Sequence, residues 1–236
     1  MAILNIETAT AVCSVCLSEK GQALFEKTSF DGPSHASLLA VFVEDVLKKS
    51  KALRLNIEAV AISAGPGSYT GLRIGLSMAK GLCFGRHIPL ISVPTLDILA
   101  RKAILTVTGG DSPDALFCAM LDARRMEVYA AIYDSSLRKV RDTEAEVISD
   151  HSFSDYLEKQ KVYFFGNGAN KCKDMLFSSN AIFIDNLHPL AADMSVLSEQ
   201  AFVEKRFENV AYFEPNYLKD FVATVPKKRI EGVAKT

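Results

Sequence analysis

The order of the expected strands and helices repeats on either side of one glycine-rich segment, residues 108–113. Before it, short apolar runs and helical spacing predict strands at 3–6, 12–17, 23–28, 59–64 and 89–93 and helices at 38–47, 70–86 and from 96 onward. After it come strands at 115–121, 127–133, 137–141, 162–165 and 181–184 and helices at 153–159 and 191–207. This order is typical of mixed α/β domains, so we expect an α/β protein with two similar lobes, although no sequence repeat relates the halves.

The composition is that of a globular protein with a core of its own. Of 236 residues, 49% are apolar and 23% are charged, a balance that needs no disulfide or structural metal for stability. The net charge of −1 does not attract the whole chain to RNA or to a membrane. No apolar stretch is long enough for a membrane span, and no signal peptide is recognisable. Because the five cysteines are scattered through apolar runs, we expect a cytoplasmic protein with reduced thiols.

Residues 65–71, Gly-Pro-Gly-Ser-Tyr-Thr-Gly, follow an apolar strand and lead into a helix. A glycine-rich turn at a helix N-terminus is a common phosphate site. A P-loop, however, has Lys-Ser or Lys-Thr after its last glycine, and here Leu72 and Arg73 follow Gly71. The dinucleotide motif fails as well, since its sixth position is Thr70. The sequence therefore does not favour autonomous nucleotide binding at this loop.

The helix after this loop carries four glycines, at positions 71, 75, 81 and 85. Each interior glycine costs about 0.5–1 kcal/mol relative to alanine, so close packing must offset the cost. Gly71, Gly75 and Ala79 are four residues apart and form a smooth stripe that would let another helix approach closely. That helix could be internal, such as helix 38–47, or it could belong to another chain.

The remaining chemical candidates are weak. Cys13 and Cys16 have the C-x-x-C spacing of metal and redox sites, but they fall in an expected strand and no second pair completes a zinc site. We therefore expect two packed thiols. None of the four histidines is four residues from another, so the helical spacing of a chelating pair is absent, and we expect no metal site. His35 is expected to begin or cap the first helix.

Polar residues follow two expected strands in corresponding places of the two halves. Glu7, with the hydroxyls of the threonines that follow it, and Asp122 could hold a metal-bound phosphate between two lobes. A pair of glycines after the strand at 162–165 could lie against an adenine. Singly, each group is more often a turn or a strand cap. The residues of this possible nucleotide cleft are Glu7, Thr8, Thr10, Asp122, Arg124, Gly166 and Gly168.

At these residues the chain resembles a known family, TsaB, also called YeaZ. The eleven-residue string 65–75, which contains the glycine loop, is the most specific part of the resemblance. The matching segments occur in family order and cover nearly the whole chain: 5–10, 65–75, 93–96, 122–129 and 215–218.

The resemblance implies a two-lobed fold of the actin and sugar-kinase type (ASKHA), with a mixed sheet and helices in each lobe. The first lobe would span 1–108 and the second 114–190, and the C-terminal helix and tail, 191–236, would return to the first lobe. The implied function is bacterial synthesis of N6-threonylcarbamoyladenosine, the modified base beside the anticodon of tRNA. In that family the paralogue TsaD is catalytic, TsaB binds and stabilises it, and the ATPase TsaE joins the pair.

The resemblance also implies where the partner binds. TsaB contacts TsaD through first-lobe helices, which here would be 37–48 and 70–86. The implied interface residues are Leu39, Phe42, Val43, Val46, Thr70, Gly71, Ile74, Gly75, Met78 and Ala79. The isolated chain would form a homodimer through the same helices.

A comparison with TsaD implies that this chain is not an enzyme. TsaD holds a metal with an H-x-x-x-H pair just after the strand that follows its glycine loop, and the matching positions here are Thr95 and Leu99. No cofactor would then be required, ATP or ADP would bind only in the complex, tRNA would be contacted indirectly, and no membrane would be involved.

Two other functions remain open from the sequence. An independent ATP-dependent enzyme of the sugar-kinase type would need Glu7, Asp122 and Gly166 to converge on one cleft, and the family often has Asp at the position of Glu7, whose extra methylene displaces the carboxylate. A peptidase would need a metal pair or a triad, and neither is recognisable. The tail lysines Lys219, Lys227 and Lys228 either touch tRNA or are solvated surface charges.

Overall fold

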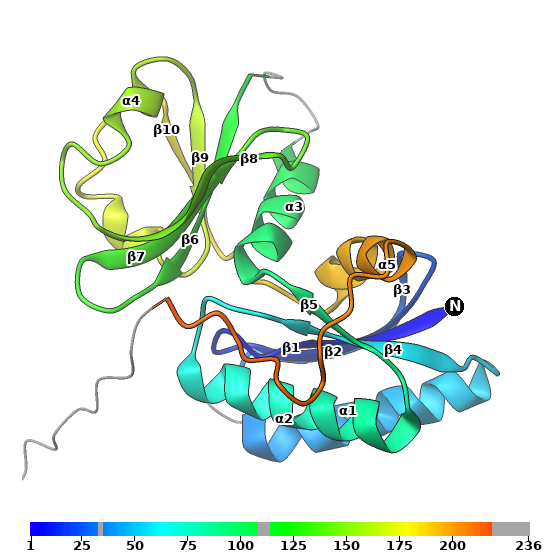
Figure 1. Ribbon diagram of the computed structural model, residues 1–236. Coiled ribbons are helices and arrows are strands. Elements are labelled where there is room, and N and C mark those ends of the chain that lie inside the picture. Colours follow the sequence, from blue (N-terminus) through cyan, green and yellow to red (C-terminus); the bar gives the residue numbers. More distant parts are fainter. Residues whose placement is uncertain (33–34, 108–113, 219–236) are drawn as a thin grey trace, which may run out of the picture.

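The computed structural model describes residues 1–32, 35–107 and 114–218. Its two lobes each contain one five-stranded sheet, stacked one above the other in Figure 1. The expected linker at 108–113 lies outside the described residues.

The first lobe is built on a mixed sheet with the order β3-β2-β1-β4-β5. Its first three strands form an antiparallel meander, and the last two run parallel to β1. The strands are β1 (Ala2–Glu7), β2 (Cys13–Glu19), β3 (Gln22–Ser29), β4 (Ile57–Ser63) and β5 (Leu90–Val93). β1 is buried along its whole length, as expected for a central strand covered on both faces.

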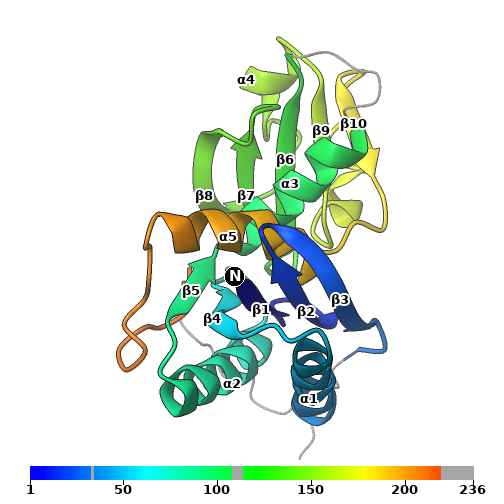
Figure 2. The same cartoon turned by 90° about the vertical axis from the view of Figure 1, so that its right-hand side faces the viewer.

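Two long helices cover one face of this sheet, α1 (His35–Ala52) and α2 (Tyr69–Arg86), and α5 (Ser195–Val203) covers the other (Figure 2). The apolar residues of α1 at helical spacing, Leu39, Val43 and Val46, are buried against the sheet. A short 3₁₀ turn, Ala192–Met194, precedes α5. The expected helix 191–207 is thus shorter, and the chain leaves it with Lys205 in a left-handed conformation (φ 57°).

The sheet of the second lobe has the strand order β10-β9-β6-β7-β8. When this order is read in reverse, from β8 to β10, each strand corresponds to the strand at the same position in the first sheet. The strands are β6 (Leu116–Asp122), β7 (Glu127–Tyr133), β8 (Lys139–Val147), β9 (Val162–Phe165) and β10 (Ala181–Ile184). Helix α3 (Thr95–Val107) packs on this sheet, and two short helical segments, α4 (Ser154–Leu157) and η1 (Asn170–Cys172), lie in its connections. The expectation of two similar lobes is confirmed, whereas helix 153–159 is only four residues long. β8 extends well past the expected end at 141, because it has no apolar alternation to mark it: its less exposed residues are Arg141, Thr143 and Glu146.

The segment before α5 connects the two lobes through hydrogen bonds. The backbone N–H groups of Ala191 and Ala192 donate to Ser14 Oγ and Glu26 Oε1 of the first lobe, each at 2.8 Å. Lys102 of α3 donates to Asp193 Oδ2 at 2.9 Å and to the carbonyl of His188 at 3.2 Å. These bonds tie α3 and the first sheet to one connecting segment.

After α5 the chain runs back over the first lobe as an extended segment, residues 204–218, which we call the C-terminal strap. Its Glu208 N–H donates to the carbonyl of Leu90 at 2.9 Å, and its Asn216 N–H donates to the carbonyl of Ala64 at 2.8 Å. Val210 and Phe213 pack against the first core. No helix in the described part of the chain is long and apolar enough to cross a membrane.

Gly71 and Gly75 of α2 face the turn between β1 and β2. A Cβ at Gly71 would overlap the carbonyl oxygen of Thr8, and one at Gly75 would overlap Thr8 Oγ1. Thr8 Oγ1 donates to the Gly71 carbonyl at 2.8 Å. The neighbour that the glycine stripe admits is therefore this turn, and neither helix 38–47 nor a helix of another chain can occupy the stripe.

Gly75, which touches Thr8, and Gly81, which has open space beside it, provide a matched test of this contact. We expect Gly75→Ala to lower the free energy of unfolding by about 1–3 kcal/mol, since Thr8 must move. Gly81→Ala should raise it by about 0.5–1 kcal/mol, because nothing lies within 4 Å of that Cβ and alanine favours the helix. Urea unfolding of both variants measures the difference. Equal effects would contradict the contact.

Candidate functional site

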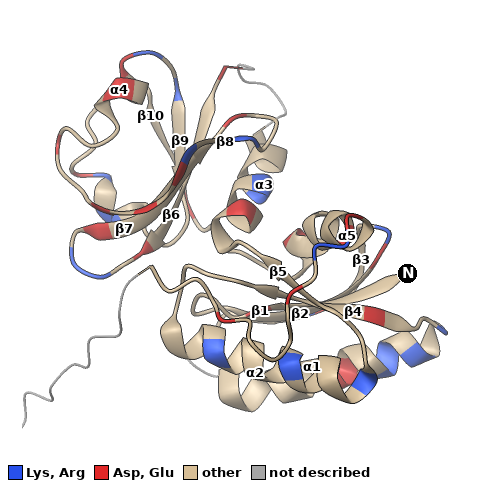
Figure 3. Ribbon diagram, viewed as in Figure 1, with Lys and Arg blue, Asp and Glu red and all other residues tan. Residues whose placement is uncertain are grey.

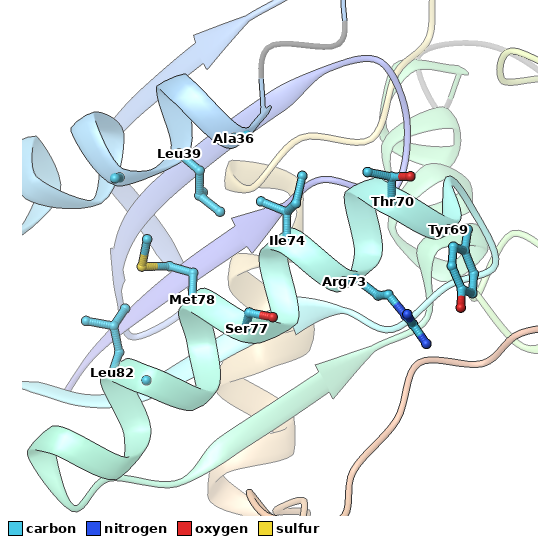
Figure 4. A pocket seen from close by; sticks show the side chains of 11 residues that line it. Ala36, Leu39, Tyr69, Thr70, Arg73, Ile74, Ser77, Met78 and Leu82 are labelled. Carbon is cyan, nitrogen blue, oxygen red and sulfur yellow. The ribbon is translucent and has the colours of Figure 1, made fainter.

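An open groove lies between α1 and α2 on the outer face of the first lobe (Figure 4). Its volume is about 780 Å³, within the range of protein binding sites. The residues that line it are mainly apolar or small: Ala36, Leu39, Ala40, Tyr69, Thr70, Arg73, Ile74, Ser77, Met78, Gly81 and Leu82. Arg73 is the one charged residue among these eleven.

The groove follows from the two faces of α2. Gly71, Gly75 and Ala79 are buried against the first lobe, and the residues three positions after each of them lie about 60° round the helix, at the edge of this buried face. These residues, Ile74, Met78 and Leu82, form a half-buried apolar row that packs against the first core and faces α1 (Figure 4). The small residues Ala36 and Ala40 of α1 and Ser77 and Gly81 of α2 keep the space between the helices open.

An aromatic and cationic cluster closes one end of the groove. The rings of Tyr69 and Tyr217 are 5.0 Å apart, and the guanidinium of Arg73 lies 4.3 Å from the centre of the Tyr69 ring. Arg73 Nε also donates to Tyr217 Oη at 3.4 Å. The C-terminal strap thus reaches the groove at this cluster.

The ten residues expected at a partner interface fall into two sets. Thr70, Ile74 and Met78 line the groove, Leu39 forms part of its floor with only 1% of its surface exposed, and Phe42 is half-buried on α1. The other five are buried inside the lobe and are not available to a partner: Val43, Val46, Gly71, Gly75 and Ala79. Their inclusion was wrong, because helical spacing shows which residues share a face but not which face points inward.

Other groove residues were missed by the sequence analysis, among them Tyr69, Arg73 and Leu82. Their signal was present in the helical period of α2. Once the glycine stripe faces the core, residues about half a turn away from it, such as Tyr69 and Arg73, must face outward, and Leu82 lies at the edge of the buried face.

The first-lobe residues of the expected nucleotide cleft are buried. Glu7, Thr8 and Thr10 have exposed fractions of 0%, 2% and 6%. Glu7 Oε1 accepts a hydrogen bond from the Ala9 N–H at 2.6 Å, and Oε2 has no protein partner among the described residues. Burial raises the pKa of the Glu7 carboxyl to about 8, and hydrogen bonds from Ala9 and Ser63 offset this only partly. At neutral pH this side chain is mainly an uncharged acid.

The second-lobe residues of that cleft belong to a separate, self-contained arrangement. Asp122 pairs with Lys171, whose Nζ also donates to the carbonyls of Arg125 and Glu127 at 2.7 and 2.6 Å. Arg124 and Arg125 both adopt left-handed backbone conformations in the turn between β6 and β7, which carries adjacent basic residues in Figure 3.

Gly166 and Gly168 lie against the backbone of β6 at Met120 and Leu121. None of the seven expected cleft residues lines the groove or the small cavity beside Leu116 and Tyr156.

The remaining candidates are core residues. Cys13 and Cys16 are buried free thiols, as expected, and burial raises their pKa values to about 11 and 12. Thr95 and Leu99, at the positions compared with a metal-binding pair, are fully buried. Among the residues described, no group of three or more His, Cys, Asp or Glu side chains is placed to hold a metal.

Curated relatives match this chain over nearly its full length. The tRNA threonylcarbamoyladenosine biosynthesis protein TsaB of Escherichia coli (strain K12) is 34% identical over 94% of this chain and 96% of its own. The protein of the same name from Bacillus subtilis (strain 168) is 27% identical over 98% of this chain and 99% of its own.

Solved structures agree with the two-lobed architecture. YeaZ from Pseudomonas aeruginosa superposes with a TM-score of 0.73 at 26% identity, over 92% of this chain and 99% of that one. A putative N-acetylmannosamine kinase from Listeria monocytogenes has a TM-score of 0.50 at 10% identity, over 87% of this chain and all of that one. The second likeness concerns the fold alone and confirms the expected actin and sugar-kinase architecture.

A family model also matches most of the chain. The model described as TsaD, tRNA N6-adenosine threonylcarbamoyltransferase, covers residues 32–227. This agrees with a common ancestry of the two proteins, while the curated relatives that match end to end carry the name TsaB. The chain therefore belongs to the TsaB (YeaZ) family of tRNA threonylcarbamoyladenosine biosynthesis proteins.

Proposed function

We propose that this chain is a non-catalytic subunit that takes part in the synthesis of N6-threonylcarbamoyladenosine in tRNA by binding and stabilising TsaD. The observation that carries the proposal is the groove between α1 and α2. Ile74, Met78 and Leu82 form a half-buried apolar row there, beside Leu39 of α1, which packs against the first core on one side and lines the open groove on the other. An exposed apolar surface of this kind on a protein with its own complete core is typical of an interaction site.

The shape of the groove favours a helix as the docking element. Two parallel ridges with small residues between them accept the side chains of a third helix, as in helix packing generally. When the chain is alone, the same surface on a second copy can fill the groove, which gives a homodimer. TsaD and a second copy of this chain would then compete for one surface.

The absence of a catalytic role is supported by the interior of the first lobe. Thr95 and Leu99 are buried core residues where TsaD has its metal-binding pair, and Thr8 is packed against Gly71 and Gly75. We propose that catalysis belongs to TsaD, that the ATPase TsaE joins the pair, and that ATP or ADP binds only in the complex. Contact with tRNA is then indirect, and the complex works in the cytoplasm.

An independent ATP-dependent enzyme of the sugar-kinase type is less well supported. Such an enzyme needs an ionised carboxylate facing magnesium and phosphate. Glu7 is buried, and its raised pKa of about 8 keeps it mainly protonated at neutral pH. Asp122, the other carboxylate that this alternative needs, is paired with Lys171.

The docking surface is tested by reversing its polarity. We expect Met78→Asp and Ile74→Asp to weaken binding to TsaD by about 100-fold or more, because a buried charge would face an apolar partner. Phe177→Asp is the matched control, since Phe177 is an exposed aromatic residue (84%) of the second lobe and should leave binding unchanged.

Calorimetry gives the dissociation constants, and absolute mass after size exclusion gives the assembly state. Circular dichroism and thermal unfolding establish that each variant is folded. If both groove variants bind TsaD as tightly as the unsubstituted chain does, the docking site lies elsewhere.

The protonation of Glu7 gives a separate prediction for pH dependence. The unfolded carboxyl has a pKa near 4.5 and the folded one about 8. Between these values the unfolded chain releases the proton and the folded chain keeps it, so stability falls as pH rises. Glu7→Gln is uncharged throughout and should lack this fall.

Urea unfolding of both proteins at pH 5 and pH 8.5 measures the effect. A stability difference between the two proteins that does not change over this range would contradict the protonated carboxyl. Magnesium-ATP binding that is present in the unsubstituted chain and lost in Glu7→Gln would instead support the sugar-kinase alternative.

A further inference from the structure

Arg73, the charged residue of the groove lining, is held in place by two tyrosines. Its guanidinium lies 4.3 Å from the centre of the Tyr69 ring, and its Nε donates to Tyr217 Oη at 3.4 Å. Packing on an aromatic ring and bonding to a hydroxyl restrict the rotation of a long side chain. The guanidinium is therefore oriented before a partner arrives, and little conformational entropy is lost when it binds one.

The terminal amino groups of Arg73 remain available to a partner. The side chain is exposed at the rim of the groove. Glu214 of the strap lies near it, but among the residues described no carboxylate forms an ion pair with Arg73. Two terminal N–H groups in one plane match the two oxygens of a carboxylate, which makes an Asp or Glu side chain the best complement to this guanidinium.

The two helices that form the groove offer no free carboxylate of their own. α2 contains no Asp or Glu between Tyr69 and Arg86, and all of its charged residues are basic. α1 has no acidic residue before Glu44. Glu44 and the next residue, Asp45, are each paired with a lysine of the same chain, at 2.6 and 3.2 Å. A second copy that docked through the same helices would thus bring Arg73 no unpaired carboxylate from them.

The apolar row and Arg73 therefore make different demands on a partner. The row formed by Ile74, Met78 and Leu82 accepts any apolar helix face, including that of a second copy. A partner that covers Arg73 without a carboxylate removes water from a charge and returns nothing for it. A partner that places a carboxylate there gains charge-assisted hydrogen bonds. Specificity between two partners is the difference between these two outcomes.

We propose that Arg73 selects a foreign partner over a second copy of this chain, by pairing with an Asp or Glu that lies beside the apolar face of the docking helix. Tyr69 and Tyr217 hold the guanidinium ready for that acid. The proposal rests on the proposed function, since it takes the groove as the docking surface and TsaD as the foreign partner.

Arg73→Gln in the full-length chain tests the selection. It should weaken binding to TsaD by about tenfold, because a charge-assisted pair is lost, and it should flatten the dependence of the dissociation constant on salt. Self-association, measured by analytical ultracentrifugation, should be no weaker than in the unsubstituted chain. Unchanged affinity for TsaD, or loss of self-association by the same factor as TsaD binding, would overturn the proposal.

Lys80→Gln is the matched control. It removes the same charge from the same helix, and Lys80 Nζ also contacts the strap, where it donates to the Ala211 carbonyl at 3.1 Å. Lys80 is not among the residues that line the groove, so this variant should change TsaD affinity by less than about twofold. Weakening equal to that of Arg73→Gln would mean that net charge or the strap explains the effect, and the proposal would be wrong.

Arg73→Lys separates the charge from its geometry. It keeps the charge and should restore the salt dependence, but not the full affinity, because an ammonium lacks the planar pair of donors. Thermal unfolding followed by circular dichroism establishes that each variant is folded.

This proposal and the docking proposal fail in different ways. If Met78→Asp abolishes TsaD binding and Arg73→Gln has no effect, the groove is the docking surface and the selective role of Arg73 is wrong. If Arg73→Gln weakens TsaD binding and Met78→Asp does not, the apolar row is not the docking surface and the carboxylate contact of Arg73 stands without it.

Discussion

The contact between the β1–β2 turn and the first two turns of α2 determines which residues of this helix are buried in the first lobe and which are exposed. Thr8 lies directly on the helix, and glycine at positions 71 and 75 is what allows its carbonyl and hydroxyl groups to approach. This contact fixes the rotation of α2 about its own axis. As a consequence, Arg73 and Ser77 on the far side of the helix are exposed, and the apolar row from Ile74 to Leu82, next to the glycine stripe, is turned toward α1. The groove and the packing of the core are therefore two results of one interaction.

Much of the fold could be predicted from the order of apolar runs. The antiparallel meander, the parallel strands after helices and the repetition of this order in the second lobe all follow local rules. The errors occurred where local patterns are ambiguous. The expected strand at 137–141 was too short, since β8 runs from Lys139 to Val147 through mostly polar residues. The apolar run from 191 looked like one long helix although only Ser195–Val203 is α-helical. That helix ends in a local turn with Lys205 in a left-handed conformation (φ 57°) and the Arg206 N–H donating to the Ala201 carbonyl at 2.8 Å, and no glycine is present there to signal the end.

The candidate site was predictable only in part. Helical spacing identified α2 as unusual, but it could not show that the glycine stripe faces a turn 63 residues earlier, where Thr8 bonds to Gly71. The same limit applies to the expected nucleotide cleft. Whether Glu7 is a solvated ligand or a buried acid depends on how β2, β4 and the glycine loop close around it, and the pairing of Asp122 with Lys171 joins residues 49 positions apart. The candidate residues could be identified from residue type and order in the sequence. Their roles depend on long-range packing, which the sequence alone does not show.

The strap also has a consequence for how this protein can associate. β5 is the last strand of the first sheet, and an uncovered last strand offers its backbone to any other extended chain. Here the Leu90 carbonyl already accepts the Glu208 N–H, and Ser92 Oγ donates to the Glu208 carboxylate at 2.6 Å. The chain thus shields this border of the sheet with its own backbone while its helices stay open. Pairing of a further extended chain, the step by which a sheet grows into fibrous aggregates, is therefore hindered at that border.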